Sequence, residues 1–528
     1  MRSADAANKS QHFQKANQLY KKALDLDSKD LDLRIKYALS FFALNAFQES
    51  VHEFHTLHVE FPEDVRILNG CAVSYIRLGR FELAIQFLKK LVSKDPQDYD
   101  SWMNLCYAAG SSALHSDTIF YALQALQLKP LEPRSHNNMG SALLMAGRVS
   151  DALVSFDTAL SLDSNNYDAM SNIATSYSIL GKPAKALEIF NQCLAFAKGN
   201  FDSEASLRYR MSFDLLRIGE LKQGWAMYDQ GFIPKDSRSR NPKRPFTVPL
   251  WDGRMLEEKT LLIWREQGLG DELMFLSTLH QAQQRCKKII VECDARLIVP
   301  LQRSFPDITF REASFTSQTL HSTYADFDYH IPMGSLMGIF RSAFSDFEES
   351  KPFISPDPER ASIFEQRLKD LPNRVKIGIC WRSSVLNPER NSAYAPISEW
   401  ESILRLPNVD FINLQYGESS DELRNVEEHF GVKIHQWPDL DLRNDLDGIF
   451  SLISCLDHVV TATTAISEMA PATGTPTCIL FPHNSWVLFG TDQYLVHKDI
   501  STYVCPEGTG VAQLIPQVAE DLKNFYRL

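Results

Sequence analysis

The sequence predicts an α-helical repeat array followed by an α/β region made of two Rossmann-like units. Three observations lead to this fold class. The chain has 528 residues, too many for one compact core at roughly 150 residues per domain. A period of 34 residues runs through about the first 200 positions. Short apolar runs separated by helical segments fill the remainder.

The repeat is defined by residue types that recur at a step of 34. Prolines recur at Pro62, Pro96 and Pro130. A small residue recurs at Ala38, Ala72, Cys106, Gly140 and Ala174, and a mostly large apolar one at Tyr20, Phe54, Leu88, Ala122, Phe156 and Phe190. Turn glycines stand at Gly79, Gly147 and Gly181. Each unit is therefore expected to be two short helices, because small residues allow close crossing, glycine ends the first helix and proline stops the second.

A polar column runs along the predicted first helices at Asn104, Asn138 and Asn172, with Asn69 and Asn137 beside it. An asparagine amide offers one acceptor and two donors, so such a column is able to pair with the backbone of an extended peptide. These residues are the candidate acceptor-binding positions. The alternative is that asparagine is simply frequent at this position of the repeat.

Composition and charge exclude several functional classes. There are 54 basic and 66 acidic residues, a net charge of −12, which argues against general nucleic-acid binding. We find no apolar run of about 18 residues and no secretory leader, so we expect no membrane span and a cytoplasmic location. The 9 cysteines are scattered without a C-x-x-C pair, which favours free thiols. His52, His55 and His58 favour an exposed polar face over a metal site, because the third lies well around the helix from the first.

The second half is predicted to alternate strands and helices after a polar linker at residues 233–250. The expected strands are Thr260–Trp264, Lys288–Cys293, Phe327–Pro332, Lys376–Trp381, Asp410–Tyr416, Lys433–Trp437, His458–Ala462 and Thr477–Phe481. A break at Pro352–Pro358 separates two groups of strands, so the expected domains are 1–232, 251–355 and 356–528. In such folds ligands bind at the carboxyl ends of the strands.

The loop after the first expected strand is rich in polar residues and glycine. Gln267, Gly268 and Gly270 would let the backbone approach an anionic ligand at the start of the next helix. Asp271 would begin that helix as an ionised carboxylate, or serve only as its cap. Glu266 and Glu272 are the other carboxylates of the segment.

Both halves resemble known families. Trp102, Leu105, Gly147, Ala152, Phe156 and Ala159 match the usual residues of the tetratricopeptide repeat, and the asparagine column resembles that of the nucleocytoplasmic O-GlcNAc transferases. The stretches GWAMYDQ, PLWDG, TLLIWREQGLGDE, KIGICWRSS, FINLQYG, LDHVVTATTA and GTPTCIL resemble a bacterial family with such repeats before a domain similar to family 9 heptosyltransferases. This resemblance implies a GT-B fold, inverting sugar transfer and no bound metal or other cofactor, with 251–355 as the acceptor half and 356–528 as the donor half.

The resemblance also implies roles for individual residues. Asp271 matches the proposed general base, with Glu266 and Glu272 as fallback bases. Donor binding falls to Gln267, Gly268, Gly270, Arg382, Ser383, Ser384, Arg390, Thr461, Thr463, Thr464, Glu468, His483 and Trp486. Arginine suits a leaving phosphate because its planar fork never loses its charge. The chain departs from the family pattern at Thr463, Glu468 and Pro471, where an aspartate, a histidine and a glycine are usual.

The expected function is transfer of a sugar from a nucleotide donor to Ser or Thr of a protein held by the repeats. Flagellin is the first candidate acceptor and a nonulosonic acid from a CMP donor is one candidate sugar, since some flagellin-modifying transferases have this layout. Glycan or lipid-linked acceptors stay open. One alternative is an inactive scaffold or secretion chaperone with a transferase-like half. Another is an epimerase or hydrolase that turns over its substrate without a protein acceptor.

Overall fold

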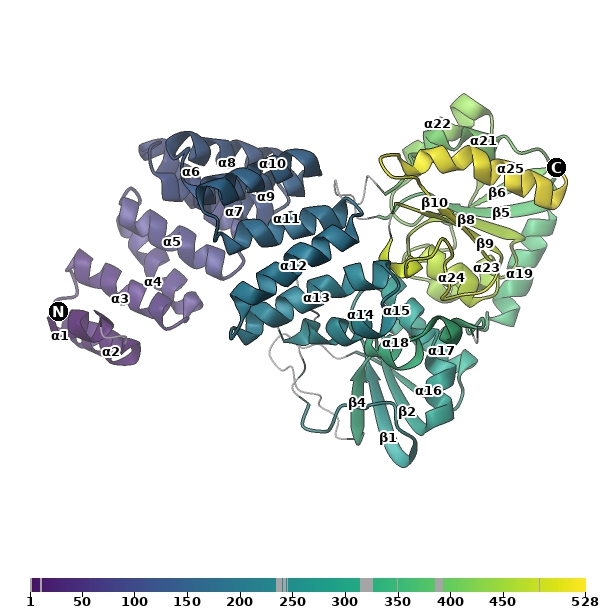
Figure 1. Cartoon of the computed structure of the whole chain (residues 1–528), viewed down its shortest axis with the longest axis horizontal. Coiled ribbons are helices and arrows are strands. Elements are labelled where there is room, and N and C mark those ends of the chain that lie inside the picture. The colour runs from purple at the N-terminus through teal and green to yellow at the C-terminus, as the bar shows by residue number, and fades with distance from the viewer. Residues whose placement is uncertain are drawn as a thin grey trace. The chain divides into compact units, whose positions relative to one another are not determined.

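The protein divides into two compact units, Met1–Ser176 and Tyr177–Leu528. The structure is a computed structural model (Figure 1) that describes residues 2–9, 12–233, 240, 244, 246–313, 326–348, 350–384, 393–483 and 485–528.

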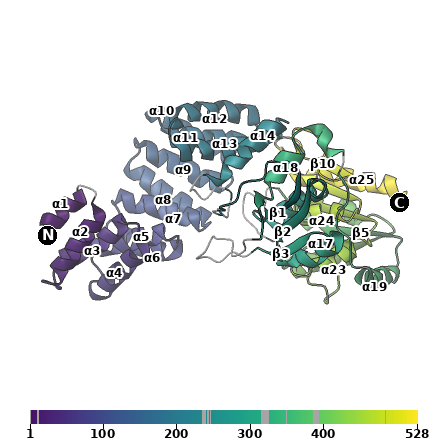
Figure 2. The same ribbon diagram turned by 90° about the horizontal axis from the view of Figure 1, so that it is seen from below.

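In unit 1 each helix up to residue 162 packs on its neighbour along the chain, as Figure 2 shows. Its helices are α1 (Arg2–Lys9), α2 (Phe13–Leu24), α3 (Leu31–Ala43), α4 (Phe47–Glu60), α5 (Val65–Arg77), α6 (Phe81–Lys94), α7 (Tyr99–Ser111), α8 (His115–Leu128), α9 (Pro133–Met145), α10 (Val149–Leu162) and α11 (Tyr167–Ile179), the last of which ends in unit 2. Asp30, Asp64 and Asp98 cap α3, α5 and α7, because each carboxylate accepts from a free backbone N–H of the first turn.

The 34-residue period appears in the backbone as well as in the side chains. A residue with positive φ recurs at Asn45, Gly79, Ala113, Gly147 and Gly181, where the first helix of a pair turns into the second. The predicted small and large columns are buried throughout, from Ala38 to Ala174 and from Tyr20 to Phe190. A Cβ added to Gly140 would stand 2.5 Å from the ring of Phe156, which shows why a residue without a side chain occupies that crossing.

Unit 2 begins with three helices, α12 (Pro183–Ala197), α13 (Phe201–Arg217) and α14 (Leu221–Tyr228). A four-stranded parallel sheet follows in the order β3-β2-β1-β4. Its strands are β1 (Leu256–Trp264), β2 (Cys286–Cys293), β3 (Thr309–Glu312) and β4 (Tyr329–Pro332). The helices of this part are α15 (Leu269–Leu276), α16 (Leu279–Arg285), α17 (Ile298–Ser304) and α18 (Ser335–Phe340).

A six-stranded parallel sheet completes unit 2 in the order β10-β9-β8-β5-β6-β7. Its strands are β5 (Val375–Cys380), β6 (Val409–Asn413), β7 (Ile434–His435), β8 (His458–Ala462), β9 (Thr477–Phe481) and β10 (Ile500–Val504). Its helices are α19 (Pro358–Lys369), α21 (Glu401–Leu404), α22 (Ser420–Phe430), α23 (Leu446–Ile453), α24 (Ile466–Ala472) and α25 (Ile515–Tyr526). Short 3-10 turns are η1 (Asp229–Phe232), η2 (Ala295–Leu297), η3 (Phe344–Phe347), η4 (Ile397–Glu399), η5 (Trp486–Leu488) and η6 (Val511–Leu514).

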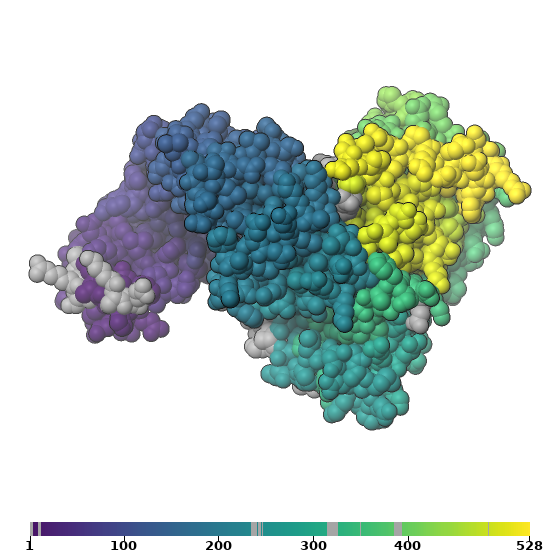
Figure 3. Space-filling model, viewed as in Figure 1, coloured from purple at the N-terminus to yellow at the C-terminus, as the bar shows by residue number. Residues whose placement is uncertain are grey.

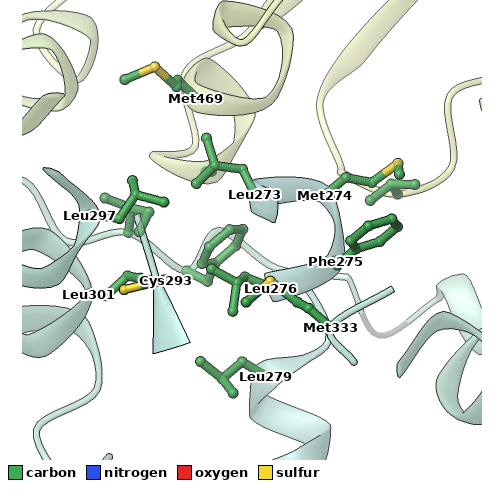
Figure 4. Close-up of a cluster of buried hydrophobic side chains, with 14 of the residues drawn as sticks. Leu273, Met274, Phe275, Leu276, Leu279, Cys293, Leu297, Leu301, Met333 and Met469 are labelled. Atoms are coloured by element: carbon green, nitrogen blue, oxygen red, sulfur yellow. The ribbon is translucent and has the colours of Figure 1, made fainter. Parts of the chain in front are cut away.

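Two apolar layers hold the six-stranded sheet. On one face, α25 packs on alternate residues of β5 such as Ile377 and Ile379, and it appears in yellow on the surface of unit 2 in Figure 3. The opposite face belongs to a core that runs on into the four-stranded sheet. Figure 4 shows Leu273 of α15 between Leu276 and Met469 of α24, so α15 and α24 share this core.

The predicted strands lie where the structure has strands, with β8 and β9 beginning and ending as expected. Two strands, β3 and β10, were not predicted. Both are edge strands with one buried residue each, Phe310 in β3 and Tyr503 in β10, so neither shows the buried apolar run that marks the inner strands of the two sheets.

All nine cysteines lie in described segments and are free thiols. Among the described residues, no group of three His, Cys, Asp or Glu side chains is arranged to hold a metal ion. No described helix combines the length and apolar character needed to cross a membrane.

Candidate functional site

A cavity of about 570 Å³ lies in unit 2 between the two sheets. Its lining comes from segments that follow the carboxyl ends of β1 and β2 on one side and of β5, β6, β7, β8 and β9 on the other. The glycine, polar and aromatic lining residues are Gly268, Gly270, Asp271, Arg296, Ser383, Ser384, Tyr394, Tyr416, Arg443, Thr463, Thr464, Ser467, Glu468, Phe481, Ser485 and Trp486. Ligands of open parallel sheets bind at this end of the strands, so the cavity is the candidate site.

The loop between β1 and α15 forms one wall of the cavity. Gly268 precedes the helix, and its N–H donates to Oδ2 of Asp271 at 3.3 Å. Gln267 has a positive φ of 40°, a backbone conformation that is costly for a residue with a side chain. Asp271 lines the cavity in the first turn of α15, where the helix dipole stabilises its negative charge. Asp271 therefore caps α15 and lines the cavity at the same time.

Glu266 lies behind this loop and does not line the cavity. Its carboxylate accepts from Nε of Arg240 at 2.7 Å and from the N–H of Gly334 at 2.8 Å, and both side chains of the pair are fully buried. Arg240 also bonds Asp229 at 3.0 Å and lies against the rings of Tyr228 and Phe232. Because Arg240 and the N–H of Gly334 hold its carboxylate, Glu266 fixes the start of the loop.

Glu272 also points away from the cavity and into a charged network. Its oxygens accept from Nε of Arg265 and from the N–H of Asp294, each at 2.8 Å. Burial raises the pKa of Glu272 to about 7, which the charge of Arg265 partly offsets. Asp294 joins the network to Arg296, whose side chain does line the cavity.

Of the residues that follow β5, some line the cavity and others do not. Ser383 and Ser384 line the cavity. Arg382 does not: its Nε donates to Glu422 at 2.9 Å and its Nη2 donates to the carbonyl of Glu418 at 2.7 Å. Arg390 lies outside the described residues.

The threonines at the end of β8 and after it also differ in whether they line the cavity. Thr463 and Thr464 line the cavity, and Oγ1 of Thr464 accepts from the N–H of Ile466 at 3.2 Å. Thr461 is buried beneath them and donates to the carbonyl of Ala462 at 2.8 Å. Glu468 follows on α24, lines the cavity, and is bonded by Tyr494 and His497.

The segment after β9 supplies an aromatic wall. Trp486 lines the cavity and packs against Phe213 of α13 and Trp225 of α14, with ring centroids 5.5 and 6.2 Å away. The last two helices before the sheets thus support a residue of the candidate site. His483 does not line the cavity, and its backbone N–H donates to the thiol of Cys505 at 3.1 Å.

Four lining residues with large polar or charged side chains escaped the sequence analysis. Arg296 and Arg443 are both cavity residues, and Nη1 of Arg296 donates to the backbone carbonyl of Arg443 at 2.7 Å. The guanidinium of Arg443 forms no ion pair with any described residue. Tyr394 and Tyr416 complete the set. The rule that ligands gather at the carboxyl ends of strands, applied to β2 and β7 as well, would have pointed to both arginines.

Some asparagines of the column in unit 1 already contact other side chains of the protein. Nδ2 of Asn172 donates to Oδ1 of Asn137 at 3.0 Å, and Nδ2 of Asn138 lies 3.4 Å from the sulfur of Met103. Asn104 is half-buried, and Asn69 is exposed at the edge of a separate apolar hollow of about 280 Å³. The column does not form one uninterrupted ladder.

Family models match two parts of the helical region. A family model described as "Tetratricopeptide repeat" matches residues 167–200, which span α11 and α12, and one described as "Coatomer epsilon subunit" matches residues 8–129. Protein FlbA of Caulobacter vibrioides is 27% identical over 529 residues, covering 98% of this chain and 88% of FlbA. Its similarity therefore extends across the helical repeats and the two sheets.

Solved structures similar to this chain include two repeat proteins. A tetratricopeptide repeat protein from Parabacteroides merdae is 13% identical, with a TM-score of 0.41, over 45% of this chain and 92% of its own. A thermophilic TPR protein of Thermus thermophilus is 22% identical, with a TM-score of 0.30, over 35% of this chain and 97% of its own.

Proposed function

We propose that the protein is an inverting, metal-independent glycosyltransferase of GT-B type that transfers a sugar from a nucleotide donor to a protein. The observation that carries the proposal is the cavity, which Asp271 lines together with arginine, serine and threonine residues that follow strands of the other sheet. Such a cavity offers a base to one reactant and hydrogen-bond donors to the phosphates of the other.

In the proposed reaction, Asp271 takes the proton of an acceptor hydroxyl. The acceptor oxygen forms a bond to the anomeric carbon while the bond to the leaving phosphate breaks, and that electron pair stays on the phosphate oxygen. Backbone N–H groups at the start of α15 and the guanidinium of Arg443 are suited to the negative charges. Glu266 and Glu272 act through the fold, because both are buried in ion pairs.

The helical repeats are the proposed acceptor-binding part, with a Ser or Thr of flagellin as the first acceptor to test. Tetratricopeptide repeats offer a long surface for an extended segment, and tethering the acceptor raises its effective concentration at the base. Asn69 and Asn104 are the members of the column for which the structure shows no hydrogen bond to another described side chain.

Replacing Asp271 by Asn tests the proposal. The variant keeps the shape of the loop but removes the base, so we expect kcat for sugar transfer to fall by about 10²–10⁴-fold. Intact mass of flagellin incubated with the protein and a panel of nucleotide sugars gives the measurement. Asp252→Asn is the matched control, since Asp252 is an exposed carboxylate paired with Arg254 outside the cavity.

Two results would contradict the proposal. Unchanged transfer by Asp271→Asn would exclude this residue as the base. No transfer from any donor, together with intact binding of flagellin, would favour the inactive scaffold.

A further inference from the structure

The motif GWAMYDQ at residues 224–230 has no role in the proposed reaction. It covers the end of α14 and the start of η1, and none of its residues lines the cavity. Trp225 and Tyr228 are nevertheless buried, each with 2% of its accessible surface left. Aromatic side chains buried to this degree pack tightly and fix the positions of their neighbours. The neighbours of these two residues include segments that form the walls of the cavity.

Trp225 contacts both parts of unit 2 that contain a sheet. Its Nε1 donates to the carbonyl of Arg341 at 3.1 Å, and Arg341 follows α18 in the part with the four-stranded sheet. Its ring centroid lies 6.2 Å from that of Trp486 and 6.0 Å from that of Phe489, in and after η5 of the part with the six-stranded sheet. Trp225 therefore joins the two parts beside the aromatic wall of the cavity.

The turn after η5 has a backbone conformation that needs support. Phe489 is fully buried and has a positive φ of 51°, which is costly for a residue with a side chain. Its neighbour Gly490, with a φ of 76°, approaches the turn between α13 and α14 so closely that an added Cβ would lie 2.8 Å from the backbone nitrogen of Gly219. The strained turn thus rests on the end of the helical region, three residues after Trp486 of the cavity wall.

The loop of the proposed base is supported by the same motif. Gln267 has a positive φ of 40°, and its Nε2 donates to the hydroxyl of Tyr228 at 3.4 Å. The next residue of the motif, Asp229, accepts from Nη1 of Arg240 at 3.0 Å, and Arg240 in turn holds Glu266. Strained residues persist only where the surrounding contacts impose their conformation. The strained residues on both sides of the cavity therefore each contact an aromatic residue of α14.

We propose that Trp225 and Tyr228 are positioning residues that hold the two walls of the cavity in place before the ligand arrives. Trp225 acts through the turn that carries Trp486, and Tyr228 acts through the loop that carries Asp271. Because the walls are already ordered, binding includes no cost for ordering them. The inference deepens the proposed function and rests on it only in taking the cavity as the place where a nucleotide sugar binds.

The test compares Trp225→Leu with Trp400→Leu in the full-length protein. Trp400 is the matched control, because it too is buried and its Nε1 donates to a backbone carbonyl, that of Ala395, at 3.2 Å. It belongs to the core between the six-stranded sheet and α25, whereas Trp225 belongs to the core on the opposite face. Both changes remove the same indole, so an effect that came only from lost stability would appear in both variants.

Hydrogen exchange measured by mass spectrometry follows the aromatic wall without any ligand. Trp225→Leu should raise the exchange rates of the backbone amides of residues 485–490 by about tenfold or more, because the strained turn loses its support. Trp400→Leu should leave these rates within about twofold of the wild type.

The same measurement follows the loop of the base. Tyr228→Phe removes only the hydroxyl that accepts from Gln267, so the exchange rates of residues 266–271 should rise by about threefold or more. Tyr503→Phe is its control, because that tyrosine donates to Asp521 at 2.9 Å and does not line the cavity. An unchanged rate in either segment would overturn the role of the residue proposed to hold it.

Calorimetric titration separates positioning from a purely structural role. The probes are CMP, UMP, GMP, AMP, CMP-sialic acid, UDP-glucose and GDP-mannose. A variant that is fully folded at the titration temperature loses affinity only if the site itself has changed. Trp225→Leu should weaken the binding of the preferred compound by about tenfold, and Trp225→Phe, which keeps an aromatic ring, by about threefold or less. Trp400→Leu should stay within about twofold of the wild type.

Equal effects of Trp225→Leu and Trp400→Leu on exchange or on affinity would overturn the proposal and assign Trp225 to the fold alone. If thermal melting shows that either leucine variant is not folded, Trp225→Phe is compared with Trp400→Phe in both measurements. If the wild type binds none of the probes, the proposed function is overturned, whereas the exchange rates still decide whether α14 holds the two walls. The two failures are therefore distinguishable.

Discussion

The contacts that stabilise unit 1 internally differ in kind from those that stabilise unit 2. In unit 1 the same few contacts recur every 34 residues, so each crossing resembles the next and none is unique. In unit 2 the loop that carries Asp271 depends on one buried arginine, Arg240, and Arg244 forms a second buried ion pair with Glu292 of β2. Repeated contacts can be predicted from a period in the sequence, whereas a single long-range ion pair cannot.

The largest expected effect tests the dependence of unit 2 on Arg240. Replacing Arg240 by Met leaves Glu266 buried without its cation, which should lower the free energy of unfolding by about 3–5 kcal/mol. Chemical denaturation followed by tryptophan fluorescence gives the measurement. Arg254→Ala, which breaks an exposed ion pair, should leave stability unchanged within error.

Removing both charges sharpens this test. In the double variant Arg240→Met with Glu266→Gln the uncompensated carboxylate is gone, so part of the lost stability should return. If the double variant is as unstable as the sum of the single ones, the ion pair is not what holds the loop.

The second largest expected effect is on nucleotide affinity, and it distinguishes the roles of two arginines of unit 2. Arg443 lines the cavity and forms no ion pair with any described residue, whereas Arg382 is held by Glu422. Arg443→Ala should therefore weaken nucleotide binding by about tenfold or more, and Arg382→Ala should weaken it less. Calorimetric titration with the nucleotide that the wild type binds best gives the comparison, and the reverse order would return the predicted donor role to Arg382.

The third effect concerns one crossing of unit 1. A methyl group on Gly140 would meet the ring of Phe156 at 2.5 Å, so Gly140→Ala should lower the free energy of unfolding by about 1–2 kcal/mol despite the better helix propensity of alanine. Gly110→Ala is the matched control, because its methyl would meet the flexible end of Met145 at 2.7 Å. Equal losses in the two variants would contradict the role assigned to the close crossing.

The fold could be predicted wherever burial leaves a pattern in the sequence. The columns through Phe54 and Ala72 and the apolar runs of β8 and β9 each stand out by period or by composition. The edge strands β3 and β10 do not, because most of their residues face solvent or only partly pack.

The candidate site was predicted less completely, for a different reason. The loop with Gly268 and Asp271 was found because glycine and acidic residues follow a buried strand. The pairing of Arg382 with Glu422, 40 residues away, depends on how β5 and α22 lie in space. The same holds for Tyr494 and Glu468, which nothing in their spacing connects.

The smallest expected effect returns to the turns of unit 1. Ala113 stands in the register of Gly79 and Gly147 with a positive φ of 57°, where an alanine costs roughly 1–2 kcal/mol. Ala113→Gly relieves that cost but adds freedom to the unfolded chain, so we expect a net gain of about 0.5–1 kcal/mol. Thermal and chemical denaturation of the full-length protein give the measurement.

Substitutions at two further positions of the same register test whether backbone strain explains the effect of Ala113→Gly. Asn45→Gly should stabilise less than Ala113→Gly, because asparagine tolerates the positive φ of 58° at that turn better than alanine does. Gly79→Ala should destabilise, because it creates the strain that Ala113→Gly removes. If all three changes left stability unaltered, the recurring turn would be a consequence of helix packing and not a cause of it. In that case only the apolar columns, and not the turn residues, would explain why the fold of unit 1 can be predicted from its sequence.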